Sequence, residues 1–174
     1  MTDQWKIRKA DDADAERLAL IGAATFLESF AGILDGDAIV EHCKAQHDAR
    51  TYHGYLANGG SAWLAEISDG GAPVGLSLLT KPDIPGGAAD GSDLELKRIY
   101  AFSRFHGGGL GAALLEPVIE AARLAGAKRL LLGVYAENAR AIGFYGKHGF
   151  AQIGDRNFQI GHKTYYDVVL AKQL

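Results

Sequence analysis

The chain has few of the features that mark secreted, membrane-spanning or nucleic-acid-binding proteins. Cys43 is its single cysteine, so an intramolecular disulfide and a disulfide-based secreted fold are excluded. No apolar run approaches the roughly 20 residues that a membrane-spanning helix needs. Residues 1–5 lack a basic stretch followed by an apolar one, so we expect no signal peptide and a cytoplasmic location. The net charge of −3 argues against nucleic acid as a partner.

The sequence also lacks the spacings of metal sites and of the commonest phosphate loop. The histidines other than His106 are scattered without metal-ligand spacing, so we expect no metal. No Gly-Lys-Ser/Thr stands before a helix, which excludes the loop that binds nucleoside triphosphates. Ser29 and Cys43 have no recognisable base or motif around them, and we expect them to be structural.

The composition is that of an ordinary globular protein. Apolar residues make up 48% and charged residues 22% of the 174 residues. This length suits one domain with a real hydrophobic core, and we expect residues 1–174 to form it.

Hydrophobic periodicity predicts a mixed order of elements, β-α-α-β-β-β-α-β-α-β-β. We expect strands over residues 5–10, 61–67, 73–80, 94–102, 129–135, 150–154 and 164–171. Helices are expected over residues 11–30, 37–56, 110–125 and 138–149. Turn-forming residues predict a hairpin at 68–71, a loop at 81–92 and a link between the last two strands at 155–163.

The most informative stretch is glycine-rich and follows the strand over 94–102. Residues 107–111 hold four glycines, and the helical pattern begins at Leu110. The first amides of a helix have no partner inside it, and the helix dipole adds partial positive charge there. Glycine has no Cβ, so an anion can come close to the backbone. A tight turn would need one glycine; four favour a phosphate or pyrophosphate site.

Two cofactor classes fit this loop. Gly107-x-Gly109-x-x-Ala112 matches the dinucleotide fingerprint, and Glu137 after the next strand would be the ribose ligand of an oxidoreductase. That fold needs further βα units, and only about sixty residues remain after the loop. The stretch 95–115 also resembles motif A of the GCN5-related N-acetyltransferases (GNAT), in which Q/R-x-x-G-x-G/A holds the pyrophosphate of acetyl-CoA. Here the frame begins with His106 in place of Gln or Arg.

A second motif and the order of elements support that resemblance. Residues 137–150 are similar to motif B of the same family, in which an Asn and a Tyr contact the cofactor; these fall on Asn138 and Tyr145. The resemblance implies the α/β GNAT fold: one mixed central sheet of about seven strands, splayed at its central strand, with four helices on its two faces. It also implies an acetyl-CoA-dependent N-acetyltransferase that acts on a primary amine of a small molecule by direct attack in a ternary complex.

The resemblance assigns roles to individual residues. Tyr145 is the expected acid that protonates the leaving thiolate, with a core aromatic as the alternative. Glu95 is the expected base, acting through water, with an ion pair to Lys97 as the alternative. Glu28, Glu95 and Tyr135 are expected to contact the acceptor. The residues expected to contact acetyl-CoA are Ile99 and Ala101 through their backbone, His106, Gly107, Gly109, Leu110, Gly111, Ala112, Asn138, Tyr145 and Lys147.

The acceptor expected from a narrower resemblance is a polyamine. Residues 25–30, 98–100, 132–135 and 170–172 resemble bacterial spermidine/spermine acetyltransferases. Fixed negative charges attract a polycation, and such charges stand at Glu28, Asp35, Asp37, Glu41 and Glu95. A solvated helix start explains the middle three equally well. A non-catalytic CoA-sensing domain stays open as a further function, as does a homodimer; no membrane partner is expected.

Overall fold

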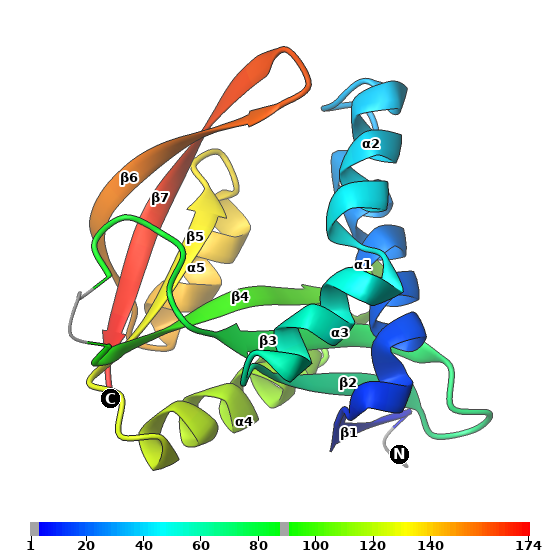
Figure 1. Ribbon diagram of the computed structural model, residues 1–174, viewed down its shortest axis with the longest axis horizontal. Helices are drawn as coiled ribbons and strands as arrows, with labels where there is room; N and C mark the ends of the chain where they lie inside the picture. Colours follow the sequence, from blue (N-terminus) through cyan, green and yellow to red (C-terminus); the bar gives the residue numbers. More distant parts are fainter. Residues whose placement is uncertain (1–3, 88–90) are drawn as a thin grey trace. The chain divides into compact units, whose positions relative to one another are not determined.

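The computed structural model describes residues 4–87 and 91–174, and its strands and helices follow the predicted order except that three helices, not two, stand between the first two strands (Figure 1). In that described part, seven strands form one sheet with the hydrogen-bonding order β1-β2-β3-β4-β5-β7-β6. The sheet is mixed, because β4 and β5 are parallel whereas β5 and β7 are antiparallel. The predicted α/β fold class is confirmed.

The strands are β1 (Trp5–Lys9), β2 (Ser61–Ile67), β3 (Pro73–Thr80), β4 (Asp93–Ala101), β5 (Arg129–Tyr135), β6 (Ala151–Ile160) and β7 (Lys163–Gln173). The helices are α1 (Ala15–Phe30), α2 (Gly36–Gln46), α3 (Ala49–Ala57), α4 (Leu110–Leu124) and α5 (Ala139–Lys147), with short 3-10 turns η1 (Asp12–Asp14) and η2 (Ser103–Phe105).

The helix predicted over residues 37–56 is two helices, and the prediction is wrong at this point. α2 ends at Gln46, and α3 begins at Ala49. Asp48 has extended backbone angles, and its side chain accepts a hydrogen bond of 2.8 Å from the amide of Thr51. This is an N-cap, which starts a new helix and turns the chain between the two.

The last hairpin is longer than predicted. β6 runs to Ile160, so the link expected over 155–163 is mostly strand. Ile160 pairs with Lys163, which leaves Gly161 and His162 as a two-residue turn, and Gly161 has the positive φ of 60° that such turns favour. The first five residues of β6 are all exposed, and exposed residues alternate with more buried ones only in its second half, from Asp155 to Ile160.

The chain groups into two compact units, each with its own core, and the single-domain organisation remains a prediction. The first unit comprises Met1–Leu78 and Arg98–Val118, and the second comprises Leu79–Lys97 and Ile119–Leu174. β4 contributes its first half to the second unit and its second half to the first.

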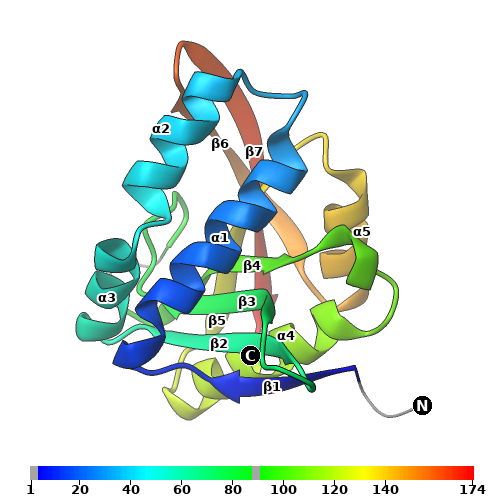
Figure 2. The same ribbon diagram turned by 90° about the vertical axis from the view of Figure 1, so that its right-hand side faces the viewer.

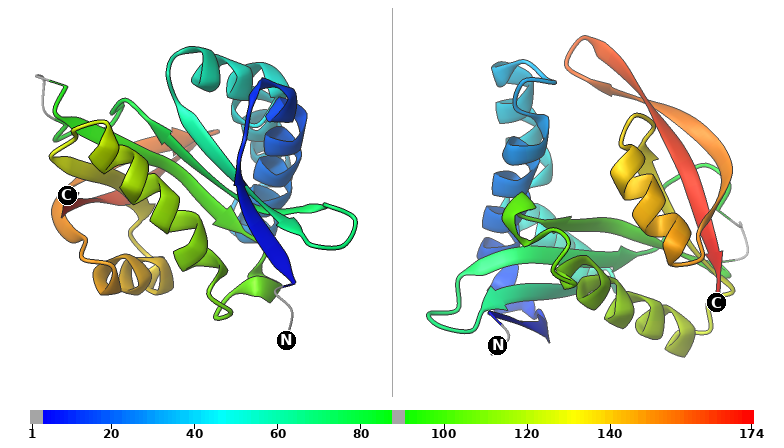
Figure 3. Two further views of the ribbon diagram at one scale, coloured as in Figure 1. Left: turned by 90° about the horizontal axis from the view of Figure 1, so that it is seen from below. Right: turned by 180° about the vertical axis from the view of Figure 1, so that it is seen from behind.

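In the first unit, helices lie on both faces of β2 and β3 (Figures 2 and 3). α1 and α3 cover one face around a core of Ala10, Ala15, Leu18, Ile21, Tyr52, Ala62, Leu64, Leu76 and Leu78. The first half of α4 packs on the other face around Ala65, Val74, Leu110 and Leu114. This second core holds the start of α4, and with it the glycine-rich turn, against the sheet.

In the second unit, β5 is the buried strand that its apolar sequence predicted. Leu130, Leu131 and Leu132 are at most 1% exposed. β5 pairs with β7 over its whole length, and Leu131 joins a core with Ile84, Val169 and Ala171. α5 lies beside β5 and β7 (Figure 1 and the right-hand view of Figure 3).

Residues 4–87 and 91–174 offer neither a metal cluster nor a segment that could cross a membrane as a helix. No three His, Cys, Asp or Glu side chains of these residues are placed to hold a metal ion. None of the helices they form is both long and apolar enough to span a bilayer.

Candidate active site

The glycine-rich segment makes the turn into α4 that the sequence predicted. Gly107 and Gly109 have positive φ values of 80° and 86°, and nothing lies within 4 Å of the place where a Cβ would stand at either residue. The first bond of the helix joins the amide of Ala113 to the carbonyl of Gly109 at 3.0 Å. The amides of residues 110–112 precede that bond and have no acceptor inside the helix. Free amides, open space and the helix dipole together suit a phosphate or pyrophosphate.

The start of α4 is fixed to the sheet by close backbone approach. Ser77 on β3 donates its hydroxyl to the carbonyl of Leu114 at 2.9 Å. A Cβ on Gly75 would come within 2.9 Å of the carbonyl of Tyr100 and 3.0 Å of the Leu114 side chain. A larger residue at position 75 would therefore push the helix off the strand, so Gly75 sets the position of the turn.

His106 binds the end of β4. Its Nε2 lies 3.0 Å from the carbonyl oxygen of Ala101, so the ring links the glycine turn to the strand. Ala101 and Ile99 are the residues whose backbone is expected to pair with the pantetheine arm. A carbonyl oxygen has two lone pairs, so Ala101 can accept a second hydrogen bond beside that of His106.

Glu28 is bound within the first unit. One carboxylate oxygen accepts from the amide of Ser103 and the other from its hydroxyl, each at 2.9 Å. This pair of bonds ties α1 to η2, the short turn that leads to the glycines. Glu28 therefore has a structural role next to the predicted anion site, and contact with the acceptor remains a prediction.

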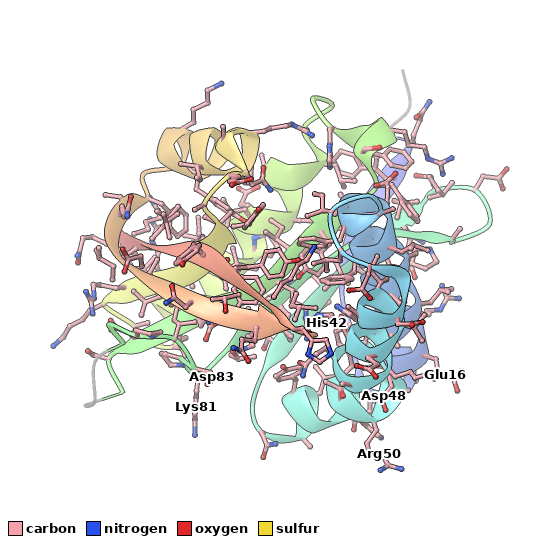
Figure 4. All side chains as sticks on the ribbon, turned by 90° about the horizontal axis from the view of Figure 1, so that it is seen from above. Glu16, His42, Asp48, Arg50, Lys81 and Asp83 are labelled. Atoms are coloured by element: carbon pink, nitrogen blue, oxygen red, sulfur yellow. The ribbon has the colours of Figure 1, made fainter. Side chains whose placement is uncertain are left out.

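Glu95 is buried on β4, and its side chain holds the loop that follows β3. The residue is 2% exposed, and its Oε2 accepts from the amide of Asp83 at 2.7 Å. Its Oε1 lies 3.6 Å from Nζ of Lys97, which also binds Oδ2 of Asp83 at 3.0 Å. Asp83 is labelled in Figure 4. The ion pair weighed as the alternative role of Glu95 is thus present, and its role as a base remains a prediction.

We expect Glu95→Gln to lower kcat and to flatten the acid limb of the pH–rate profile. Glutamine keeps an oxygen for the amide of Asp83 but cannot take up a proton. Steady-state kinetics measured across pH test this expectation. Asp83→Asn is the control, because it removes the ion pair between Asp83 and Lys97 and leaves the Glu95 carboxylate in place. If the KM for the amine rises alone, Glu95 binds the acceptor and does not act as the base.

α5 carries the motif residues of the second unit. The side chain of Asn138 accepts from the amide of Ala141 at 3.1 Å, so the predicted helix cap is confirmed. Tyr145 is 8% exposed, and its ring meets those of Phe144 and Phe150 edge-on at 5.3 and 5.6 Å. The ring of Tyr145 is therefore part of the core, and the acid role of its hydroxyl remains a prediction.

Two further predicted residues lie in the second unit. The hydroxyl of Tyr135, on β5, donates to Oε2 of Glu137 at 3.0 Å, and this bond raises the pKa of Tyr135. Lys147 is exposed in the last turn of α5, where its charge complements the helix dipole. The predicted site residues thus form two groups. The glycine turn, Glu28, His106 and the end of β4 lie in the first unit; Glu95, Tyr135 and the residues of α5 lie in the second.

A buried polar cluster in the first unit has no counterpart among the predicted site residues. Arg98, His47 and Tyr52 are 7%, 4% and 0% exposed. Nδ1 of His47 lies 3.0 Å from the hydroxyl of Tyr52, and the Arg98 guanidinium lies 5.1 Å from the centre of the Tyr52 ring. Burial and the charge of Arg98 lower the pKa of His47 to about 3, so its ring is neutral. The sequence signal was an arginine two residues from both Leu96 and Tyr100, at the alternate positions of a strand that share one face.

Residues 27–150 match the acetyltransferase (GNAT) family. The chain is similar to an uncharacterised N-acetyltransferase of Mycobacterium tuberculosis, with 32% identity over 161 residues that cover 92% of this chain and 98% of that protein. An uncharacterised N-acetyltransferase of Lactobacillus delbrueckii subsp. lactis is 27% identical over 169 residues, which are 97% of each protein.

Solved structures share the fold over nearly the whole chain. The PaiA N-acetyltransferase of Thermoplasma acidophilum, in complex with coenzyme A, superposes with a TM-score of 0.77 at 19% identity and covers 98% of this chain and 99% of its own. A GNAT-family acetyltransferase of Streptococcus pneumoniae has a TM-score of 0.71 at 26% identity, with the same coverage of 98% and 99%.

Proposed function

Because the chain belongs to the acetyltransferase (GNAT) family, we propose that it moves an acetyl group from acetyl-CoA to a primary amine of a small molecule by direct attack in a ternary complex. That it is an acyltransferase follows from the family and from relatives named N-acetyltransferases. The observation that carries the proposal is the open glycine turn at the start of α4, where Gly107 and Gly109 leave space and residues 110–112 have amides for a pyrophosphate. The coenzyme A in the Thermoplasma structure supports acetyl-CoA as the cosubstrate.

The reaction requires two proton transfers and a donor to the developing oxyanion. An alkylammonium has a pKa near 10.4, so its proton must leave before the nitrogen attacks the thioester carbonyl. A C–N bond then forms and the C–S bond breaks, and the thiolate, with a pKa of about 8.5, takes up a proton. In the proposal Glu95 removes the first proton through water, Tyr145 supplies the second, and backbone amides bind the oxyanion.

The remaining contacts of the proposal concern acetyl-CoA. The pantetheine arm would pair with the backbone of Ile99 and Ala101 as an added strand does. His106 and the glycine turn would face the pyrophosphate, and Lys147 is the cation proposed for the 3′-phosphate. Asn138 already caps α5 through its side-chain oxygen, so its side-chain amide nitrogen is the group proposed to contact the cosubstrate.

The family assignment decides between the two cofactor classes that fit the glycine turn. A dinucleotide fold continues after its loop with further parallel βα units. Here β5 pairs with β7 in antiparallel fashion, and β6 pairs with β7 in the same way. The acyltransferase is therefore favoured over the oxidoreductase alternative, and turnover with an amine is the measurement that separates it from the non-catalytic sensing domain.

A polyamine is the acceptor that the narrower sequence resemblance predicts. Three of the carboxylates that motivated it already bind the protein. Glu28 binds Ser103, Asp35 caps α2 through the amide of Ala38 at 2.9 Å, and Glu95 accepts from the amide of Asp83. Their charges remain, but their hydrogen-bonding capacity is in part used. Spermidine is accordingly one arm of the acceptor panel described below.

Thermal denaturation with different cofactors tests the proposed function. We expect acetyl-CoA to raise Tm and NAD to leave it unchanged, because the family and the antiparallel pairing after the turn favour CoA over a dinucleotide. A ligand at about 100 times its Kd adds roughly 2.7 kcal/mol to the free energy of unfolding, which is a shift of several degrees for a chain of this size. A shift with NAD in place of acetyl-CoA would restore the oxidoreductase alternative.

A further inference from the structure

Arg98 on β4 carries a buried positive charge that no carboxylate of the described residues neutralises. The residue is 7% exposed, and its Nη1 is buried without a hydrogen-bond partner. Its Nη2 lies 3.4 Å from the side-chain oxygen of Gln46, which is a long and weak hydrogen bond. The rings of Tyr52 and Tyr55 lie 5.1 and 5.2 Å from the guanidinium and stabilise its charge in part. A buried charge without an ionic partner is costly, so its retention needs an explanation.

The side chains around Arg98 are aromatic and uncharged. His47, neutral because burial lowers its pKa, has a buried Nε2 without a hydrogen-bond partner, and its ring lies 6.1 Å from that of Tyr100. His42, labelled in Figure 4, stacks on Phe26 at 4.1 Å. Arg98, His47 and Tyr52 are buried, whereas His42, Tyr55 and Tyr100 of the same cluster are half-buried. Within the first unit, the cluster thus contains the Arg98 cation and two nitrogens without hydrogen-bond partners, Nη1 of Arg98 and Nε2 of His47, next to aromatic rings.

Gln46 is the group that a ligand would displace. Its side chain is exposed at the end of α2, and its bond to Arg98 is at the limit of hydrogen-bonding distance. A carboxylate in the place of the Gln46 amide would reach Nη2 and, beside it, the unpartnered Nη1. Such a two-point contact is the geometry in which arginine binds carboxylates most strongly.

We propose that Arg98 and its aromatic neighbours form a subsite for a carboxylate of the acceptor, so that the enzyme acetylates amino acids or similar amines that carry an acid group beside an apolar part. The inference rests on the proposed acetyl transfer and names its substrate class. One cation in the subsite matches one negative charge, which favours a carboxylate over a phosphate dianion. A polyamine would bring further positive charge to Arg98, and like charges repel.

Matched acceptors test the subsite. The panel consists of L-phenylalanine, L-leucine and L-methionine, each with its amide, together with spermidine. Thiol release at saturating acetyl-CoA gives kcat/KM for each compound. We expect each acid to exceed its amide by about tenfold or more, since hydrogen bonds between charged groups are stronger than neutral ones. The amides have less basic amines, which attack more readily at neutral pH, so a preference for the acids cannot come from the amine itself.

Variants locate the preference at Arg98. We expect Arg98→Met to bring the acid-to-amide ratio to about one while the acetyl-CoA shift in Tm is unchanged. Arg50→Met is the matched control, because Arg50 lies exposed on α3 and points outward in Figure 4. Gln46→Glu places a carboxylate next to Nη2 and should lower the ratio without removing a buried side chain. This exposed variant keeps the test decisive should Arg98→Met fail to fold.

The outcomes separate the subsite from the proposed function. If amides match the acids, if spermidine is acetylated faster than all of them, or if Gln46→Glu keeps the full acid preference, the subsite is wrong and acetyl transfer stands. If acetyl-CoA neither shifts Tm nor releases thiol with any amine, the proposed function fails and the subsite fails with it.

Discussion

Tyr145→Phe is expected to lower kcat by about 10²-fold or more while acetyl-CoA binding is unchanged, which is the usual scale for the loss of a positioned acid. The variant loses one oxygen atom and keeps the ring that packs against Phe144 and Phe150. The core contacts of α5 should therefore survive, and Tm should change little. Without the phenol, the thiolate of CoA would leave unprotonated or take its proton from water.

Steady-state kinetics together with acetyl-CoA titration measure both halves of that prediction. Tyr166→Phe is the matched control. Tyr166 lies on β7 and is 61% exposed, so this substitution removes the same hydroxyl group at a solvent-exposed position. An unchanged kcat in Tyr145→Phe would leave Tyr145 with a packing role alone and would remove the acid from the proposed mechanism.

Gly109→Val is expected to raise the Kd for acetyl-CoA by about 100-fold or more. The space beside Gly109 is open, so a valine there would occupy the place proposed for the pyrophosphate. Losing two hydrogen bonds to a charged phosphate costs roughly 3 kcal/mol, which is about 100-fold in affinity. Valine at a φ of 86° is also strained, and left-handed backbone costs roughly 1–2 kcal/mol for a residue with a Cβ.

Gly59→Val separates the strain from the loss of binding. Gly59 follows α3 with a φ of 85°, and it too has no atom within 4 Å of its virtual Cβ. The two variants should lose similar stability, but only Gly109→Val should lose acetyl-CoA. Isothermal titration measures the binding of each. Equal affinity in both variants would place the pyrophosphate away from the glycine turn.

The elements that depend on local patterns were predictable from the sequence. β2, β3 and β5 have the predicted bounds, because each is a short apolar run between turn residues. The start of α4 was predictable for a different reason. Positive φ at Gly107 and Gly109 is available to glycine at little cost, so their spacing indicates a turn whatever the rest of the fold does.

The sequence predictions are wrong where strand pairing or a single helix cap determines the bounds of an element. Gly154, Asp155 and Asn157 are turn-forming types, yet they belong to β6 because β7 pairs with them. The break between α2 and α3 depends on one side chain, Asp48, whose capping bond competes with an otherwise continuous helical pattern. The hydrophobic periodicity of the sequence indicates neither the extension of β6 nor the break between α2 and α3.

The partners of the candidate site residues were the least predictable part. The bonds of Glu28 to Ser103 and of Glu95 to Asp83 join residues far apart in the sequence, so only the folded chain shows them. The surroundings of Arg98 come from α2, α3 and β4, and a charged residue in a strand does not reveal from sequence whether it has an ionic partner. Motifs predicted the glycine turn and the Asn138 cap because these depend on local backbone, whereas the partners of Glu28, Glu95 and Arg98 depend on packing.

The most direct test of acetyl transfer is to follow both products of one reaction. The purified chain is incubated with acetyl-CoA and the amine panel, and free thiol and the mass of each amine are measured over time. Acetyl transfer predicts that one amine gains the mass of one acetyl group for each CoA released, and that heat-denatured protein gives neither product. Thiol release without an acetylated amine, or no turnover with any amine although acetyl-CoA binds, would contradict the account.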